Sequence, residues 1–273
     1  MPESYKLNGA VYITSIKNMF KGNGFFNMKT IAYAMPEERS ADIDEESDFR
    51  LAEAQYSSAF FCDLPGISCM LEISRLECVR GERSLFAGIG FRLDGGELLN
   101  LQGRNGSGKT SLLRILCGLA HPVAGEIRWR GELIGKLGED YRRELCYLGH
   151  HNAIKEELTP LENLLASARL ADEDLDDDDA LDALERVGLA GREDLACRYL
   201  SQGQKRRVAL ARLVNERRAL WVLDEPYVAL DSAAIELVAG LISAHLQRGG
   251  LAVLTTHQAV EVQAGVIREL RLD

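Results

Sequence analysis

Long apolar runs are missing from this sequence of 273 residues. No stretch approaches the roughly 18 consecutive apolar residues that a helix needs to cross a bilayer. The N-terminus also lacks the continuous apolar core of a secretory signal. These absences argue against a membrane-spanning protein and against a secreted one. We therefore expect a soluble, cytoplasmic protein that acts at a membrane only through a partner.

Metal-type cysteine spacing is missing as well. The chain has 6 cysteines but no C-x-x-C pair, so the sequence indicates neither a zinc site nor a C-x-x-C-H haem attachment. Scattered single cysteines in a cytoplasmic protein are usually reduced. We predict free and mostly buried thiols. The residues concerned are Cys62, Cys69, Cys78, Cys117, Cys146 and Cys197.

An excess of positive charge is also absent. The chain carries 32 Lys and Arg against 42 Asp and Glu, which gives a formal net charge of −10. General electrostatic binding of nucleic acid needs a basic surface, so this class is disfavoured. The anion that we expect is a nucleotide and not a polynucleotide. Hydrophobic residues make up 46% of the chain, which suffices for a sizeable core.

The pattern of the chain changes at Met70. Residues 1–69 contain no motif, whereas from Leu71 onward apolar and polar residues alternate as in a strand. Residues 1–69 are open to two interpretations: a disordered or lightly structured extension, or a start codon assigned too far upstream. We favour the second, because residues 70–273 hold every element that the chemistry below needs. Failure of a chain starting at Met70 to restore activity in a null strain would contradict it.

The strongest single motif is GRNGSGKT at residues 103–110, which matches G-x-x-x-x-G-K-[ST]. It lies between an apolar run at 97–101, a predicted buried strand, and apolar residues at helical spacing in 112–116. In such a loop, glycines let backbone N–H groups surround phosphates at the helix N-terminus. Taken alone, the pattern would also fit a simple turn. The candidate nucleotide ligands are Gly103, Arg104, Asn105, Gly106, Ser107, Gly108, Lys109, Thr110 and Ser111.

A second helix start suited to an anion lies at residues 200–204, with the sequence LSQGQ. Ser201 is a good N-cap residue, and Gly203 permits close backbone approach. The strongly helical segment from Lys205 to Val214 follows directly, so its positive end lies here. An ordinary capped helix is the alternative if this pentad is taken alone. We count Ser201, Gly203 and Gln204 as candidate nucleotide ligands.

Two carboxylates end a third apolar run. Residues 219–223 read as a buried parallel strand, and Asp224 and Glu225 follow at its carboxyl end. We expect Asp224 to hold Mg²⁺ through water, opposite the hydroxyl of Thr110. Glu225 is the candidate that orients or deprotonates an attacking water, while Lys109 supplies positive charge.

A further strand, Leu251–Leu254, runs into His257. An imidazole at a strand tip suits a γ-phosphate sensor, so His257 joins Lys109 and Glu225 as a candidate catalytic residue. Residues 229–231 form a predicted turn that ends at Asp231. By contrast, we interpret His245, within an apolar helix at 234–246, as a structural residue, and His121 beside a helix end likewise.

The remaining segments predict strands and an insertion of helices. Strands are indicated at 85–93 and 126–129, and a short one ends at Leu148. Residues from Pro160 to about Cys197 read as helical. The carboxylate-rich run 172–179 favours a solvated turn over a metal site, because nothing in it fits a calcium loop.

This order of motifs resembles the ATP-binding subunits of ABC transporters over residues 70–273. The resemblance implies an α/β P-loop NTPase fold of ABC type, with a RecA-like core, an antiparallel β subdomain and an α-helical subdomain at about 155–197. It implies that two copies stack head to tail around two ATP, each with Mg²⁺. Ser201 and Gly203 of one copy then complete the γ-phosphate site on the phosphate loop of the other, with Asp231 in the D-loop.

Two positions depart from the family's usual pattern. His150 occupies the place of the usual glutamine in the loop before the helical subdomain, and we expect it to contact Mg²⁺-bound water. Arg80 occupies the place of the aromatic residue that usually stacks on adenine, and a guanidinium plane can stack on a base too. Phe86, close by in the sequence, reads as a strand core residue.

Residues 147–150, 154–159 and 200–213 resemble the haem-exporter ATPases of bacterial cytochrome c maturation. That family implies integral membrane subunits (CcmB/CcmC-like), a peripheral location on the cytoplasmic face of the bacterial inner membrane, and release of a haem-loaded chaperone. The motor of another small-substrate or multidrug exporter is one alternative, and a pull-down from detergent-solubilised membranes discriminates between them. A soluble ABC switch in DNA repair or translation is another, which ATPase stimulation by nucleic acid would favour.

Overall fold

A parallel sheet of five strands forms the centre of the computed structural model, which describes residues 71–81, 83–256, 258, 262–263 and 265–272. The predicted start at Met70, residues 1–69 and His257 lie outside these residues. The strand order is β6-β7-β8-β3-β9, and each neighbouring pair is parallel. Its strands are β3 (Glu97–Gly103), β6 (Leu145–Leu148), β7 (Leu220–Asp224), β8 (Leu251–Thr255) and β9 (Val266–Leu272).

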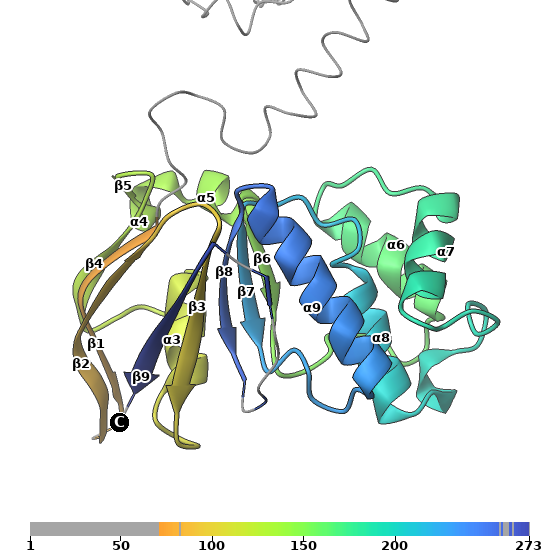
Figure 1. Ribbon diagram of the computed structural model, residues 1–273, viewed down its shortest axis with the longest axis horizontal. Helices are drawn as coiled ribbons and strands as arrows, with labels where there is room; N and C mark the ends of the chain where they lie inside the picture. The colour runs from red at the N-terminus through yellow and green to blue at the C-terminus, as the bar shows by residue number, and fades with distance from the viewer. Residues whose placement is uncertain (1–70, 82, 257, 259–261, 264, 273) are drawn as a thin grey trace, which may run out of the picture. The chain divides into compact units, whose positions relative to one another are not determined.

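The central strands are apolar because both faces of this sheet are covered (Figure 1). Side chains alternate between faces along a strand. In β7, Leu220 and Val222 join the core cluster that contains α3, whereas Trp221 and Leu223 join the cluster that contains α9. The continuous apolar run in the sequence therefore correctly predicted a strand buried on both sides.

A second, antiparallel sheet of four strands packs against α3 from the other side (Figure 1). Its strand order is β2-β1-β4-β5. The alternation from Leu71 to Ser74 is confirmed, since Leu71 and Ile73 are buried and both face the core. Phe86 is buried in the same core, as expected. The strands are β1 (Leu71–Arg80), β2 (Arg83–Leu93), β4 (Ala124–Trp129) and β5 (Glu132–Leu133).

Helices fill the connections between the parallel strands. The insertion predicted at about 155–197 contains two α-helices with their own buried cluster (Figure 1). Only the first part of the acidic run 172–179 lies outside a helix, because α7 begins at Asp177. Asp176 caps this helix by accepting a hydrogen bond from the Asp179 N–H. The three aspartates of the first turn complement the positive end of the helix dipole. The helices are α3 (Lys109–Leu116), α4 (Ile134–Leu137), α5 (Glu139–Arg143), α6 (Pro160–Leu170), α7 (Asp177–Arg186), η2 (Cys197–Tyr199), α8 (Gln202–Ala211) and α9 (Ser232–Gln247).

Buried thiols and a buried histidine match their predicted structural roles. Cys78, Cys117, Cys146 and Cys197 are buried and free, while Cys62 and Cys69 lie outside the described residues. His245 is fully buried, stacks on the Trp221 ring at 4.1 Å between centroids, and lies 3.1 Å from the Leu251 carbonyl oxygen through Nε2. Burial lowers the pKa of His245 to about 4, so this imidazole stays neutral at pH 7. None of the helices in the described part of the chain is long and apolar enough to cross a membrane.

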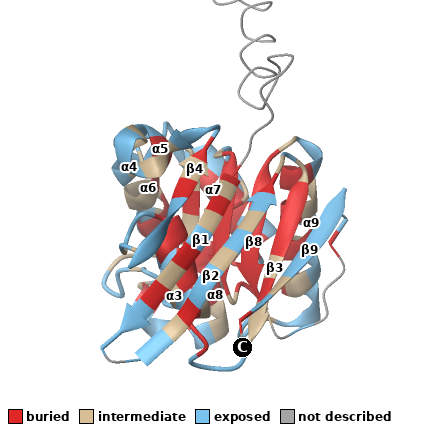
Figure 2. Ribbon diagram, turned by 90° about the vertical axis from the view of Figure 1, so that its left-hand side faces the viewer, coloured by how far each residue is buried: buried red, intermediate tan, exposed pale blue. Residues whose placement is uncertain are grey.

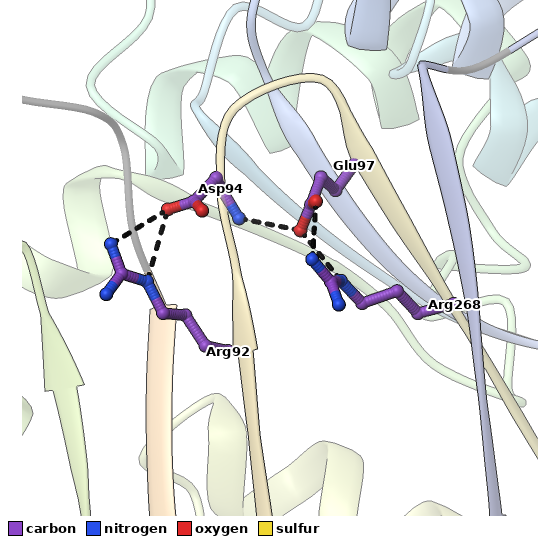
Figure 3. A network of polar contacts seen from close by, with 4 residues as sticks. All are labelled: Arg92, Asp94, Glu97 and Arg268. Atoms are coloured by element: carbon purple, nitrogen blue, oxygen red, sulfur yellow. Dashed lines mark hydrogen bonds and ion pairs between the residues drawn. The ribbon is translucent and has the colours of Figure 1, made fainter.

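The strand β9 was missed in the sequence. It lies at the edge of the parallel sheet and most of its residues are exposed (Figure 2), so its apolar residues do not form the buried run of a central strand. Its attachment is partly electrostatic (Figure 3). Arg268 donates two hydrogen bonds to the largely buried carboxylate of Glu97, at 3.0 and 2.8 Å, and the Asp94 N–H donates a third to Glu97, at 3.0 Å.

We expect Arg268→Gln to lower the melting temperature by a few degrees at pH 7. The carboxylate of Glu97 is largely buried and would lose two charge-assisted hydrogen bonds, but the exposure of Arg268 to solvent keeps the effect small. The hydrogen bonds from Arg268 hold the pKa of Glu97 below its ordinary value of 4.5. The stabilisation is therefore present above that value and is lost as pH falls through the lowered pKa.

Thermal unfolding of the wild type and the variant from pH 7 down to about pH 3 checks this, since that range spans the titration of a carboxyl group. The difference in melting temperature should shrink toward the acidic end. Glu269→Gln, an exposed carboxylate on the same strand, is the matched control and should have little effect. A pH-independent difference would contradict the assignment to Glu97.

Candidate active site

One cavity of about 580 Å³ collects most of the predicted site residues. It lies where the carboxyl ends of β3 and β7 meet the N-terminus of α3. β8 lies between these two strands, and in a parallel sheet all carboxyl ends lie at one edge, which is where ligands bind in folds of this kind. The lining residues are Arg80, Leu85, Arg104, Asn105, Gly106, Gly108, Lys109, Thr110, Ser111, His150, Asp224, Glu225 and Val228.

The loop between β3 and α3 has a conformation that requires glycine. Gly103, Gly106 and Gly108 have φ angles of 148°, 81° and 103°, which disfavour other residues. A Cβ on Gly103 would also lie 2.6 Å from the Ser107 hydroxyl oxygen and against the Leu272 carbonyl. The first turn of α3 contains no acidic residue of its own, which suits the binding of an anion at its positive end.

Two polar groups of this loop suit a phosphate ligand. Lys109 Nζ donates hydrogen bonds to the carbonyl oxygens of Gly103, at 2.6 Å, and Arg104, at 3.4 Å. The Ser107 hydroxyl is buried and has no hydrogen-bond partner among the described residues. Buried polar groups are normally hydrogen-bonded, so an unsatisfied one inside a glycine-lined loop fits a site for a polar ligand.

Asp224, at the end of β7, is almost fully buried and accepts two hydroxyl hydrogen bonds. Thr110 Oγ1 donates to Oδ2 at 2.9 Å, and Thr255 Oγ1 donates to Oδ1 at 2.8 Å. The structure thus brings together Thr110 and Asp224, the pair predicted to hold Mg²⁺. Sequence alone assigned no role to Thr255, although a polar residue at the end of an apolar strand was the available signal.

Glu225 follows Asp224 with a φ angle of 51°, in the left-handed region. For a residue with a side chain this region costs about 1–2 kcal/mol. The Glu225 N–H donates to Thr255 Oγ1 at 2.9 Å, and its carbonyl oxygen accepts from Arg206, at 2.7 Å. Arg206 is a second residue that the sequence did not indicate. These contacts fix the turn that carries the Glu225 side chain to the cavity.

His150 and Arg80 both line this cavity. His150 is exposed in the loop after β6, and its ring meets that of His151 edge-on, with 5.6 Å between centroids. Arg80 is exposed at the end of β1. Their expected contacts, with Mg²⁺-bound water and with adenine, stay predictions.

Six predicted ligands do not line the cavity. Gly103 and Ser107 belong to the loop that borders it, whereas Ser201, Gly203, Gln204 and Asp231 lie on other segments. Ser201 caps α8 by accepting from the Gln204 N–H at 3.2 Å, and the Gln204 side chain accepts from the Ser201 N–H at 2.9 Å. Asp231 caps α9 and forms a two-oxygen ion pair with Arg207, at 2.7 and 2.6 Å. The hydrogen bond from the Ala234 N–H and then Arg207 lower the pKa of Asp231. Within one chain, the second predicted anion site is therefore separate from the first.

Comparison with known proteins agrees with this geometry. The model of the ABC transporter family matches residues 86–228. The cytochrome c biogenesis ATP-binding export protein CcmA of Dechloromonas aromatica is 74% identical over 203 residues, which are 74% of this chain and 100% of that protein. This chain belongs to the ABC transporter ATP-binding family, and within it to the CcmA proteins. The CcmA protein of Nitrosospira multiformis is 54% identical over 74% of this chain and 98% of its own.

Solved structures of ABC proteins share the fold of this CcmA-family chain. A putative ABC transporter ATP-binding protein from Pyrococcus furiosus superposes with a TM-score of 0.64 at 26% identity, over 74% of this chain and 97% of its own. A dimeric ATP-binding cassette bound to ADP and Pi gives a TM-score of 0.61 at 24% identity, over 69% of this chain and 88% of its own. These structures confirm the predicted ABC-type fold, and the family model with the CcmA relatives confirms the predicted ATPase class. As an ABC ATPase, this CcmA-family chain binds nucleotide.

Proposed function

We propose that this chain is the ATP-hydrolysing subunit of an ABC exporter in cytochrome c biogenesis, and that its ATP cycle drives release of a haem-loaded chaperone. The observation that carries this proposal is the 74% identity to a CcmA protein along that protein's whole length. The cavity at the end of β3 and β7 supplies the chemistry. Its glycine loop, its lysine and its buried carboxylate are the groups that phosphoryl transfer requires.

The residues at the end of β7 fit Mg²⁺. Magnesium prefers oxygen ligands and is usually bound by one or two carboxylates together with substrate phosphates and water. Asp224 and Thr110 offer one carboxylate and one hydroxyl, already 2.9 Å apart. No cluster of three or more His, Cys, Asp or Glu that could bind a metal occurs in the described part of the chain, so the remaining ligands would be phosphate oxygens and water. The bound ion would neutralise charge on the phosphates.

We assign the steps of hydrolysis to five groups. Lys109 and the backbone amides of residues 103–110 would bind the phosphates and stabilise the charge that develops during transfer. Glu225 would orient and deprotonate the attacking water. His257, outside the described residues, is proposed to hydrogen-bond the γ-phosphate, and His150 to contact the water bound to Mg²⁺.

Two copies are proposed to share each ATP. As the ABC family implies, Ser201, Gly203 and Gln204 would reach the phosphates on the loop of a second chain. In their own chain they do not line the cavity. The capped N-terminus of α8 offers its positive helix end to that anion. Asp231, held by Arg207, would lie beside the same interface.

The proposed partners are integral membrane subunits of the CcmB/CcmC type, on the cytoplasmic face of the bacterial inner membrane. A bacterial strain that lacks its own CcmA homologue tests the whole proposal. Expression of this chain should restore covalent haem in membrane c-type cytochromes, measured by haem staining, whereas a Lys109→Ala chain at equal abundance should not. Co-purification with CcmB- or CcmC-like subunits should accompany rescue. Absence of rescue by a folded, ATP-hydrolysing chain would contradict the assigned pathway.

A further inference from the structure

The guanidinium group of Arg206 joins α8 to the loop after β6 and to the end of β7. Arg206 lies on α8 and is only 4% exposed. Its NH1 donates to the Gly149 carbonyl at 3.2 Å and to Asn152 Oδ1 at 3.3 Å, both in the loop between β6 and α6. Its NH2 donates to the carbonyl oxygens of Asp224 at 3.3 Å and Glu225 at 2.7 Å.

Burial of the charged Arg206 side chain is unfavourable unless its hydrogen bonds compensate for the lost water. Packing alone would be achieved by an apolar residue of similar size, which in buried ion sites is often no less stable. All four acceptors belong to segments that carry candidate site residues, since His150 follows Gly149 directly.

The contacts hold the peptide groups of Glu225 on both sides. Its N–H donates to Thr255 Oγ1, at 2.9 Å, and its C=O accepts from Arg206. Between these two contacts the backbone adopts the left-handed φ of 51°, a conformation that persists only where the surroundings fix it. Loss of either contact would let the turn relax and move the carboxylate.

The geometry points to Arg206 as a positioning residue for Glu225, which also ties Glu225 to the His150 loop and to α8. The inference rests on the proposed role of Glu225 as the general base. Arg206 does not touch the nucleotide cavity itself, since it is not among the residues that line it. Its removal should therefore lower the rate of hydrolysis more than the affinity for ATP.

We expect Arg206→Gln to reduce kcat about 100-fold, the effect of a displacement of about 1 Å at a reacting group. The dissociation constant for MgATP should change less than about threefold, because the phosphate loop is untouched. Arg206→Lys keeps the charge but has a single donor nitrogen in place of the planar fork, so it should recover part of the rate. Arg217→Gln, an exposed arginine beyond the same helix, is the matched control and should behave as the wild type.

A double substitution separates positioning from folding. If Arg206 acts through Glu225, adding Arg206→Gln to Glu225→Gln should leave the residual single-turnover rate unchanged. A purely structural role would lower the residual rate in both backgrounds, and that additive result overturns the positioning role alone. Wild-type kcat in folded Arg206→Gln would overturn it as well. Full turnover in Glu225→Gln would instead overturn the proposed base, and the positioning role with it. Should Arg206→Gln not fold, Arg206→Lys provides the same comparison of kcat with ATP affinity.

Discussion

Glu225→Gln is expected to abolish steady-state ATP turnover while ATP binding persists. Glutamine keeps the size of the side chain and the left-handed turn, but it cannot accept a proton from water. A positioned general base contributes about 10²–10⁴-fold to a rate, which corresponds to about 3–5 kcal/mol of barrier. The rate of phosphate release should therefore fall at least about 100-fold, and bound ATP should remain unhydrolysed.

Two measurements check this outcome on the full chain: release of phosphate at saturating MgATP, and the identity of the nucleotide retained after rapid desalting. Glu236→Gln, an exposed glutamate on α9, is the matched control and should keep wild-type turnover. Hydrolysis within about threefold of wild type in Glu225→Gln would refute the assigned base, because a general base contributes far more than that.

Ser201→Asp is expected to prevent the ATP-dependent pairing of two chains. Aspartate is as good an N-cap as serine, so α8 should begin at the same residue and the fold should survive. The added carboxylate would, however, face the γ-phosphate on the second chain, and like charges brought together cost several kcal/mol. Dimer formation should therefore weaken by about two orders of magnitude or more.

The Glu225→Gln background makes this measurable, because unhydrolysed ATP should hold the dimer together. Sedimentation with and without MgATP should give a dimer for Glu225→Gln and a monomer for the double variant with Ser201→Asp. Ser201→Asn, a neutral cap of the same shape, should retain the dimer. Each chain of the Ser201→Asp variant and of the Ser201→Asn variant should still bind one nucleotide through residues 103–110. An ATP-dependent dimer in the Ser201→Asp variant would show that Ser201 does not face the partner's phosphates.

Local patterns predicted the parts of the site that are continuous in sequence. Residues 97–116 form strand, loop and helix because a buried run, three glycines and a helical period all agree. The capping pattern around Ser201 likewise placed the start of α8. Asp224 was located because a carboxylate ends an apolar strand, whereas its contact with Thr110, 114 positions away, was seen only in the structure.

Other parts depend on contacts between distant residues, which no local pattern reports. Thr255 reaches Asp224 because β7 and β8 are neighbours in register, and Arg206 reaches Glu225 across 19 positions of the chain. Edge strand β9 lacks the buried apolar run of β7 and is held in part by the pair of Arg268 with Glu97. The sequence alone predicts neither the register of β7 against β8 nor the strand at the edge of the sheet. These features were seen only in the structure.

Lys109 and Thr110 already have hydrogen-bond partners within the protein, which a nucleotide would have to replace. The Lys109 ammonium group has two carbonyl acceptors in its own loop, and the Thr110 hydroxyl has a carboxylate acceptor. Binding is therefore an exchange of partners, in which phosphate oxygens and a cation replace groups of the protein. Such an exchange yields less affinity than the same contacts formed by unpaired groups, but the contacts of Lys109 also hold the loop in its glycine-dependent conformation. A motor that must release its product in every cycle benefits from both effects.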